Sequence, residues 1–300
     1  MTSHRRRHIP VRTARLPEKR AAVRALPPLL LLALACTRPA APAAPAAARP
    51  EGRRIVTLAP SLTDVVLALG ARDSLVGVTR FDDAPEVQTL TRVGGYTDPS
   101  LETIVRLHPD LVVCQPSPGN KGVVTTLQEA GIPVEVFTLE TIADVTAALT
   151  RLGTLLHREE AARMEVARID AARARAREAA TRRPRRPTAV LLFDIDPLIA
   201  AGPGSFAAEL LEDVGARNVV AAAPQPYPQL PLETLLARTP DLVLVAPMAA
   251  HGAGLGGLAS PLRPVARELA SSGIVRPGPA VVDALEELTR VLDDVARSPP

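Results

Sequence analysis

Apolar and polar residues follow the same pattern in two stretches of this chain, residues 101–113 and 232–244. Seven of the thirteen positions are identical, and the same offset of 131 residues relates Tyr96 to Tyr227. Each stretch opens with apolar residues at helical spacing, continues through a Pro-Asp pair and closes with a short apolar run. This pattern predicts a short helix, a turn at the proline and a buried parallel strand. Two copies this far apart indicate two similar lobes rather than a solenoid of short units.

The remaining pattern alternates short apolar runs with segments of helical spacing. Ser61 is expected to cap the first helix of the chain through its hydroxyl group. The alternation as a whole predicts an α/β fold with parallel sheets. The expected strands are 54–59, 75–79, 134–137 and 189–193, and the expected helices outside the repeats are 61–69, 121–130, 206–214 and 279–295.

Between residues 141 and 181 the chain shows no strand pattern. Residues 142–156 form one amphipathic helix, and 157–181 form a second helix rich in Ala, Arg and Glu, with an Arg-rich face that solvent is expected to cover. We therefore predict two similar lobes with central, mainly parallel sheets, joined by one long backbone helix. The N-terminal lobe is predicted at 54–156, the linking helix at 157–183 and the C-terminal lobe at 184–300.

The N-terminus has the pattern of a secretion signal. Basic residues precede the apolar run 26–35, which is too short to span a membrane and ends at Cys36. The segment 33–36 is similar to the lipobox of bacterial lipoproteins, so residues 1–36 are expected to be a signal peptide and Cys36 the lipidated residue. Ordinary cleavage after small residues is the alternative. Residues 37–53, rich in Ala and Pro, are then a tether between the anchor and the lobes.

Charge excludes one class of partner. Residues 1–36 hold eight Lys or Arg against one Glu, a net charge of +7, whereas the whole chain carries +3, so the remainder carries about −4. No basic face is left for nucleic acid.

The few aromatic residues fall in unusual places. The chain has four Phe, two Tyr and no Trp. Phe81, Tyr96 and Tyr227 all lie in predicted loops after strands, where open parallel sheets bind their ligands. Loop aromatic residues give broad, rigid contact at a low entropy cost, which suits a large planar ligand.

Other candidate chemistry is weaker. Glu102 and Glu233 occupy the same position in the first helical turn of the two repeats, where they either complement the helix dipole or share a role at the lobe surfaces. Cys114 ends an apolar strand and is expected to act as a small hydrophobic residue. Neither Ser61 nor His251 belongs to a recognisable arrangement of nucleophile, base and orienting group, so no catalytic residue is predicted.

Taken in order, these parts resemble the helical-backbone substrate-binding proteins of bacterial ABC importers, which carry vitamin B12, ferric siderophores and haem. The resemblance covers residues 54–247 and the terminal helix, and it rests on segments 54–64, 76–78, 94–95, 100–104, 108–112, 205–206, 227–233 and 239–242. It implies a ligand cleft between two lobes. Phe81 and Tyr96 would line it from the first lobe, and Phe193, Ser205 and Tyr227 from the second. The family's lobe-surface glutamates fall on Glu102 and Glu233, which would dock on the permease.

The resemblance implies a lipid-anchored periplasmic protein, expected to be a monomer, that delivers its ligand to ABC permease and ATPase subunits. A corrinoid is the expected ligand, carried as cargo, with no resident cofactor or metal. A ferric siderophore or haem is the near alternative, because Arg80 and Arg92 lie close to the loops and siderophore binders often place Arg in the cleft. An enzyme, or a lipoprotein that uses the fold only for protein contact, is the remote alternative. Residues 249–275 lack the clear strand that the family usually has before its last helix.

Overall fold

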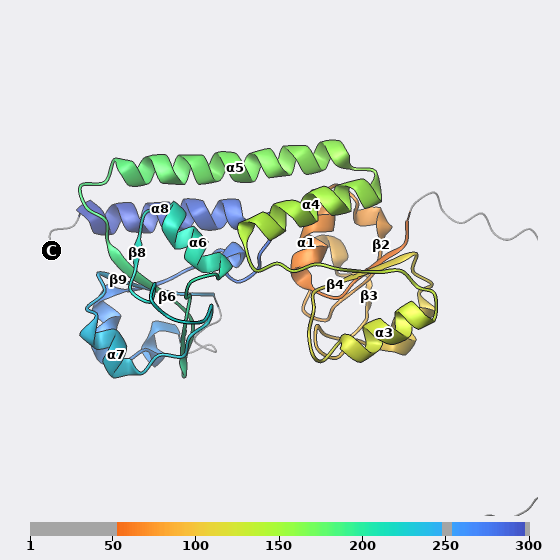
Figure 1. The fold of residues 1–300 in the computed structure, drawn as a ribbon, viewed down its shortest axis with the longest axis horizontal. Helices are drawn as coiled ribbons and strands as arrows, with labels where there is room; N and C mark the ends of the chain where they lie inside the picture. Colours follow the sequence, from red (N-terminus) through yellow and green to blue (C-terminus); the bar gives the residue numbers. More distant parts are fainter. Residues whose placement is uncertain (1–52, 248–253, 298–300) are drawn as a thin grey trace, which may run out of the picture. The chain divides into compact units, whose positions relative to one another are not determined.

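A computed structural model describes residues 53–247 and 254–297. Within these residues the chain forms two lobes, each built on its own sheet (Figure 1). The first sheet is parallel throughout and has the order β3-β2-β1-β4-β5. Its strands are β1 (Ile55–Thr57), β2 (Leu75–Val78), β3 (Thr91–Arg92), β4 (Leu111–Cys114) and β5 (Val134–Val136).

The second sheet has the order β10-β9-β6-β7, with β8 paired to β6. All of its pairings are parallel except the β6–β7 hairpin. This mainly parallel arrangement confirms the predicted α/β class. The strands are β6 (Thr188–Ile195), β7 (Leu198–Ala200), β8 (Arg217–Asn218), β9 (Leu242–Val245) and β10 (Ala266–Glu268).

Helices pack on the sheets and against one another. The longest, α5, contacts α4, α6 and α8 and so lies against helices of both lobes (Figure 1). Its buried face is a narrow stripe of small residues with one larger member, Ile169. The helices are α1 (Pro60–Ala68), α2 (Leu101–Arg106), α3 (Lys121–Glu129), α4 (Ile142–Leu156), α5 (Glu159–Thr181), α6 (Phe206–Asp213), α7 (Leu232–Ala237) and α8 (Val281–Arg297).

The two repeats fold as predicted, each into a short helix, a turn and a buried strand. The repeated aspartates have a structural role that the pattern did not indicate. Asp110 accepts a hydrogen bond from the backbone N–H of Arg54 at 2.9 Å, and Asp241 accepts one from that of Thr188 at 2.7 Å. Arg54 directly precedes β1 and Thr188 opens β6, so each aspartate fixes the start of the central strand beside its own repeat.

The turns at the prolines form as predicted. The residues before proline, His108 and Thr239, adopt positive φ angles of 44° and 40°. The steric clash with proline excludes the right-handed helical region. The tight return into β4 and β9 then uses the left-handed region instead.

Two expectations need correction. Ser61 does not cap α1, because Pro60 takes the first helical position and Ala59 becomes the N-cap, which leaves Ser61 buried inside the first turn. Residues 249–275 do contain a strand: β10 pairs in parallel with β9 over three residues. The sequence pattern does not predict it, because Ala266–Glu268 buries only its first residue and so shows no apolar run.

The limits of the lobes and of the linking helix stay predictions. Residues 1–52, which include Cys36, lie outside the described residues.

Candidate functional site

Aromatic side chains gather where strands of both sheets end. Phe81 lies three residues beyond β2, and Tyr96 follows β3 by four residues. In the second lobe Phe193 lies in β6, and Tyr227 lies in the connection between β8 and α7. Phe81 is 55% exposed and Tyr227 is 43% exposed, which is unusual for large aromatic groups in a chain with so few of them.

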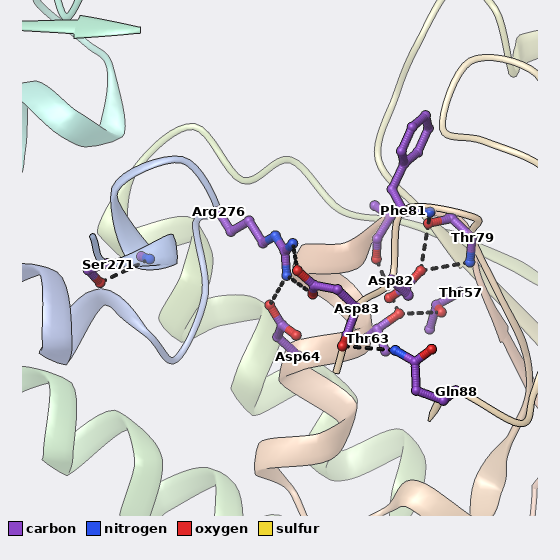
Figure 2. Close-up of polar contacts among 12 residues, drawn as sticks. Thr57, Thr63, Asp64, Thr79, Phe81, Asp82, Asp83, Gln88, Ser271 and Arg276 are labelled. Atoms are coloured by element: carbon purple, nitrogen blue, oxygen red, sulfur yellow. Dashed lines mark hydrogen bonds and ion pairs between the residues drawn. The ribbon is translucent and has the colours of Figure 1, made fainter. Parts of the chain in front are cut away.

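Hydrogen bonds to Asp82 and from Arg92 fix the Phe81 loop, residues 79–83. Asp82 is buried and accepts hydrogen bonds from the backbone N–H and the hydroxyl of Thr79, at 2.7 and 2.6 Å. Arg92 Nη1 donates to the carbonyl oxygens of Thr79 and Asp82, at 3.0 and 2.9 Å. The ring of Phe81 points away from this network (Figure 2). The loop is therefore built to present an apolar ring outward.

Tyr96 is fixed by the neighbouring loop. Its hydroxyl donates to the carbonyl oxygen of Pro116 at 2.7 Å, and Asn120 Nδ2 donates to the Tyr96 carbonyl at 3.2 Å. A pocket of about 540 Å³ adjoins this contact and is lined mainly by apolar groups, among them Pro116, Val124 and Val136. Cys114 also lines it. Burial raises the pKa of the Cys114 thiol to about 11, so it remains a protonated, unreactive group at neutral pH.

In the second lobe the structure brings two predicted site residues into contact. The rings of Phe193 and Tyr227 lie edge to face, with centroids 5.4 Å apart. Ser205 behaves differently from its prediction. It is fully buried, its hydroxyl donates to the Gly202 carbonyl at 2.7 Å, and it accepts from the Ala208 N–H as the N-cap of α6. Ser205 thus shapes the start of the helix and presents no surface to a ligand.

Sequence reasoning did not find Glu140, which lies in the connection between β5 and α4. Burial raises the pKa of the Tyr96 phenol and of the Tyr227 phenol, and the negative charge of Glu140 contributes to both shifts. Glu140 is thus within electrostatic range of a tyrosine from each lobe. No local pattern marks it, because the effect depends on two residues brought near it by the fold.

Both arginines near the loops are already engaged. Arg80 forms a two-pronged ion pair with Asp98, at 2.8 and 2.9 Å, and its guanidinium carbon lies 4.8 Å from the centre of the Phe81 ring. The guanidinium of Arg92 is held by the backbone of the Phe81 loop. These contacts orient both guanidinium groups, while the Arg80 side chain stays 47% exposed.

The glutamates of the two repeats lie at corresponding places. Glu102 and Glu233 are exposed residues in the first turns of α2 and α7, as predicted. The side chain of Glu102 is 84% exposed and pairs with Arg106 one turn later on the same helix. The alternative nucleophile Ser61 is buried in α1, and His251 lies outside the described residues.

Comparison with known proteins decides the class. Residues 55–261 match the family described as "Periplasmic binding protein". The chain belongs to this family. A vitamin B12-binding protein from Salmonella typhi is 32% identical to this binding protein over 195 residues, which cover 64% of this chain and 72% of the relative.

Solved structures of the same architecture support the fold. The periplasmic vitamin B12-binding protein of Vibrio cholerae superimposes with a TM-score of 0.70 at 22% identity, over 82% of this chain and 99% of that one. The periplasmic haem-binding protein of Roseiflexus sp. RS-1, without ligand, gives a TM-score of 0.73 at 23% identity, over 82% and 100%. At these identities the likeness establishes the two-lobed fold of this binding protein and leaves its ligand to be argued from the site.

Proposed function

We propose that this protein is the substrate-binding component of an ABC importer, and that it captures a corrinoid and delivers it to the permease. The observation that carries the proposal is the set of aromatic rings held at the strand ends of both lobes, of which Phe81 and Tyr227 are the most exposed. Such rings offer broad apolar contact to the face and edges of a macrocycle. The similarity to the vitamin B12-binding protein of Salmonella typhi supports the same ligand.

The charges near the loops favour a corrinoid over an anionic ferric chelate. A siderophore complex of net negative charge needs cationic partners, and strong pairs are formed by guanidinium groups that are free to adopt the required geometry. Arg80 and Arg92 are committed to Asp98 and to the loop backbone. Glu140 adds negative charge within range of Tyr96 and Tyr227. An uncharged macrocycle with peripheral amides avoids the repulsion that a carboxylate-rich chelate would meet.

The raised pKa values of Tyr96 and Tyr227 disfavour haem as the ligand. A tyrosine that ligates haem iron does so through its phenolate oxygen. Burial and Glu140 raise the pKa of both phenols, which opposes formation of that phenolate. A protonated phenol still stacks on a corrin and donates hydrogen bonds, as Tyr96 does to Pro116.

Delivery requires contact with the permease and its ATPase subunits. Glu102 and Glu233 provide one exposed carboxylate on each lobe, in the same helical position. Carboxylates of this kind form charge-assisted hydrogen bonds with arginines of a partner surface. Lipidation at Cys36 would keep the protein beside the membrane that holds the permease. None of the helices in residues 53–247 and 254–297 is long and apolar enough to cross a membrane.

The ligand can be identified by spectrum and by titration. Protein purified from its own host should show the visible absorption of a corrin, and calorimetry with cyanocobalamin should give one-to-one binding. Ferrichrome and haemin, titrated under the same conditions, should bind far more weakly. Tight binding of either iron compound together with no binding of cyanocobalamin would overturn the assignment. Absence of binding by all three, with binding to the permease retained, would favour a role in protein contact alone.

A further inference from the structure

An ion pair joins the Phe81 loop to the far end of the chain. Arg276 lies between the short 3₁₀ turn Ser272–Ile274 and α8, in the C-terminal lobe. Its Nη1 and Nη2 atoms donate to the two carboxylate oxygens of Asp83, at 2.7 and 2.8 Å (Figure 2). Arg276 Nη1 also lies 3.8 Å from Asp64 in α1. One guanidinium therefore links two acidic residues of the first lobe to the second, across 193 positions of sequence in the case of Asp83.

The backbone segment that carries Arg276 is held in place by contacts on both sides. Arg168 in α5 donates to the carbonyl oxygen of Pro279 at 3.0 Å, which holds the segment before α8 against the linking helix. Gly273 lies so close to Ala280 that a methyl group at that position would meet the Ala280 carbonyl oxygen at 2.0 Å. The segment around Arg276 is tightly packed at both ends, and the Arg276 side chain itself is only 24% exposed.

The acidic side of the pair belongs to the loop that carries Phe81. Asp83 is two residues from Phe81, and its side chain is 69% exposed. Thr79, Asp82 and Arg92 anchor the part of the loop before Asp83. Gln88 Nε2 donates to the Asp83 carbonyl oxygen at 2.9 Å, and Arg276 holds the Asp83 side chain from the second lobe. Because a bidentate pair fixes orientation as well as distance, Arg276 limits how far the loop can swing.

Arg276 is placed among several acidic residues. Asp82, Asp83 and Glu86 all lie within electrostatic range of Asp64, and Arg276 is a cation that faces Asp64 and Asp83. The hydrogen bonds from Arg276, and to a smaller extent its charge, hold the pKa of Asp83 below its ordinary value. Within the described residues these acids do not converge as a metal-binding group. Without Arg276, repulsion among the carboxylates would push the loop away from α1.

We propose that Arg276 is a positioning residue for ligand capture, which acts through Asp83 to set the place of the Phe81 ring. Ligand affinity then depends on an ion pair formed between the lobes. This inference rests on the proposed function for its effect on binding, whereas its effect on the loop is independent of any ligand.

The loop itself can be monitored because the chain contains no tryptophan. Phe81→Trp introduces a single reporter, and its fluorescence anisotropy in protein without ligand measures the freedom of the loop. Arg276→Gln in this background should lower the anisotropy. The charge exchange Arg276→Asp with Asp83→Arg, made together with Asp64→Asn because Arg276 also lies 3.8 Å from Asp64, should restore it. Arg276→Lys should give an intermediate value, because an ammonium group cannot form the bidentate contact.

Binding supplies the second measurement, made with cyanocobalamin on chains that keep Phe81. Arg276→Gln should weaken binding about two- to fivefold, the range of a partly exposed ion pair, and the charge exchange should recover most of the loss. Arg182→Gln, which breaks an ion pair with Glu178 on α5, is the matched control and should change neither affinity nor anisotropy. Circular dichroism of each variant confirms folding, and Asp83→Asn offers a milder break of the same pair.

The outcomes separate the two proposals. If the parent chain fails to bind cyanocobalamin, the proposed function is wrong, and the anisotropy series still decides whether Arg276 orders the loop. Unchanged anisotropy in both Arg276→Gln and Asp83→Asn would overturn the positioning role. So would affinity that falls in Arg276→Gln but is not recovered by the charge exchange, since that result indicates direct contact between Arg276 and the ligand.

Discussion

Phe193 and Tyr227 meet edge to face, with ring planes at 72° and centroids 5.4 Å apart. The contact joins the end region of β6 to the loop before α7, and aromatic pairs of this geometry contribute about 0.5–1.5 kcal/mol beyond the area they bury. Because Tyr227 remains 43% exposed, the Phe193 ring braces it while leaving one side open for a ligand.

Removal of the aromatic rings in the loops should therefore weaken cyanocobalamin binding. Phe81→Ala, Tyr96→Ala and Tyr227→Ala should each cost about 1–3 kcal/mol of binding free energy if the ring is a central contact. Tyr227→Phe keeps the edge-to-face contact and serves as the control, with affinity close to that of the parent chain. Calorimetry measures the affinities. Quenching of the two tyrosines gives a direct optical signal, because no tryptophan obscures it. Unchanged affinity in all three alanine variants would refute the site.

Glu102 and Glu233 should matter for transport but not for ligand binding. Glu102→Ala and Glu233→Ala remove exposed carboxylates, so ligand affinity and Tm should change little. Ligand-stimulated ATP hydrolysis by the reconstituted importer should fall for each variant and further for the pair. Substitution by Lys should be worse than by Ala, because it sets like charges against the arginines of the permease.

The control for this experiment is an exposed acid on another helix, such as Glu178→Ala on α5, which should leave transport intact. Normal transport by the Glu102/Glu233 double variant would return both residues to the role of helix-dipole partners.

Asp64 should make stability depend on pH. Burial raises its pKa from the ordinary value of 3.8 to about 6, with Asp82, Asp83 and Glu86 adding repulsion and Arg276 acting in the opposite direction. The folded state thus disfavours the charged form. The destabilisation disappears well below pH 4, grows between about pH 4 and 6 and is complete above pH 6.

Asp64→Asn should remove this effect. The variant should gain at most about 3 kcal/mol of unfolding free energy at pH 8, and much less at pH 4, where Asp64 is protonated in the folded state and partly protonated in the unfolded chain. Urea unfolding at pH 4, 6 and 8 measures the difference. A gain that is equal at all three pH values would show that the titration of Asp64 is not its cause.

Cys36 is predicted to carry the lipid. The parent chain, expressed in a bacterium that processes lipoproteins, should partition into the detergent phase, and Cys36→Ser should move it to the aqueous phase. Cys114→Ser is the matched control: this thiol is buried in the first lobe, so partitioning should not change. Equal partitioning of parent and Cys36→Ser would exclude the anchor and favour ordinary cleavage.

Local patterns predicted the regular elements well. The limits of α4 agree with the predicted 142–156, where Thr141 and Asp144 form a capping box at its start. Both repeats were predicted because their apolar spacing and Pro-Asp pair are local signals. The strands β3 and β8 were not predicted because two residues are too few to show a period, and β10 because it buries one residue alone. The three-residue strand β7 was not predicted either.

The site was predictable only in part. Phe81, Tyr96 and Tyr227 could be placed in loops because they follow strands and turn residues. The contacts that distinguish one ligand class from another join distant residues, as Arg276 joins Asp83 and as Glu140 acts on Tyr96 and Tyr227. Ser205 illustrates the converse, since a motif position taken from a resemblance became an N-cap with a buried hydroxyl.

The linking helix α5 lies close to both lobes at two glycines. A methyl group on Gly153 of α4 would lie 2.6 Å from the methyl of Ala162 near the start of α5, and one on Gly215 would lie 2.5 Å from that of Ala180 near its end. Both glycines are buried, so any larger side chain at either position would force the backbones apart at the cost that overpacking carries. The seats of the linking helix on the two lobes therefore tolerate no increase in volume.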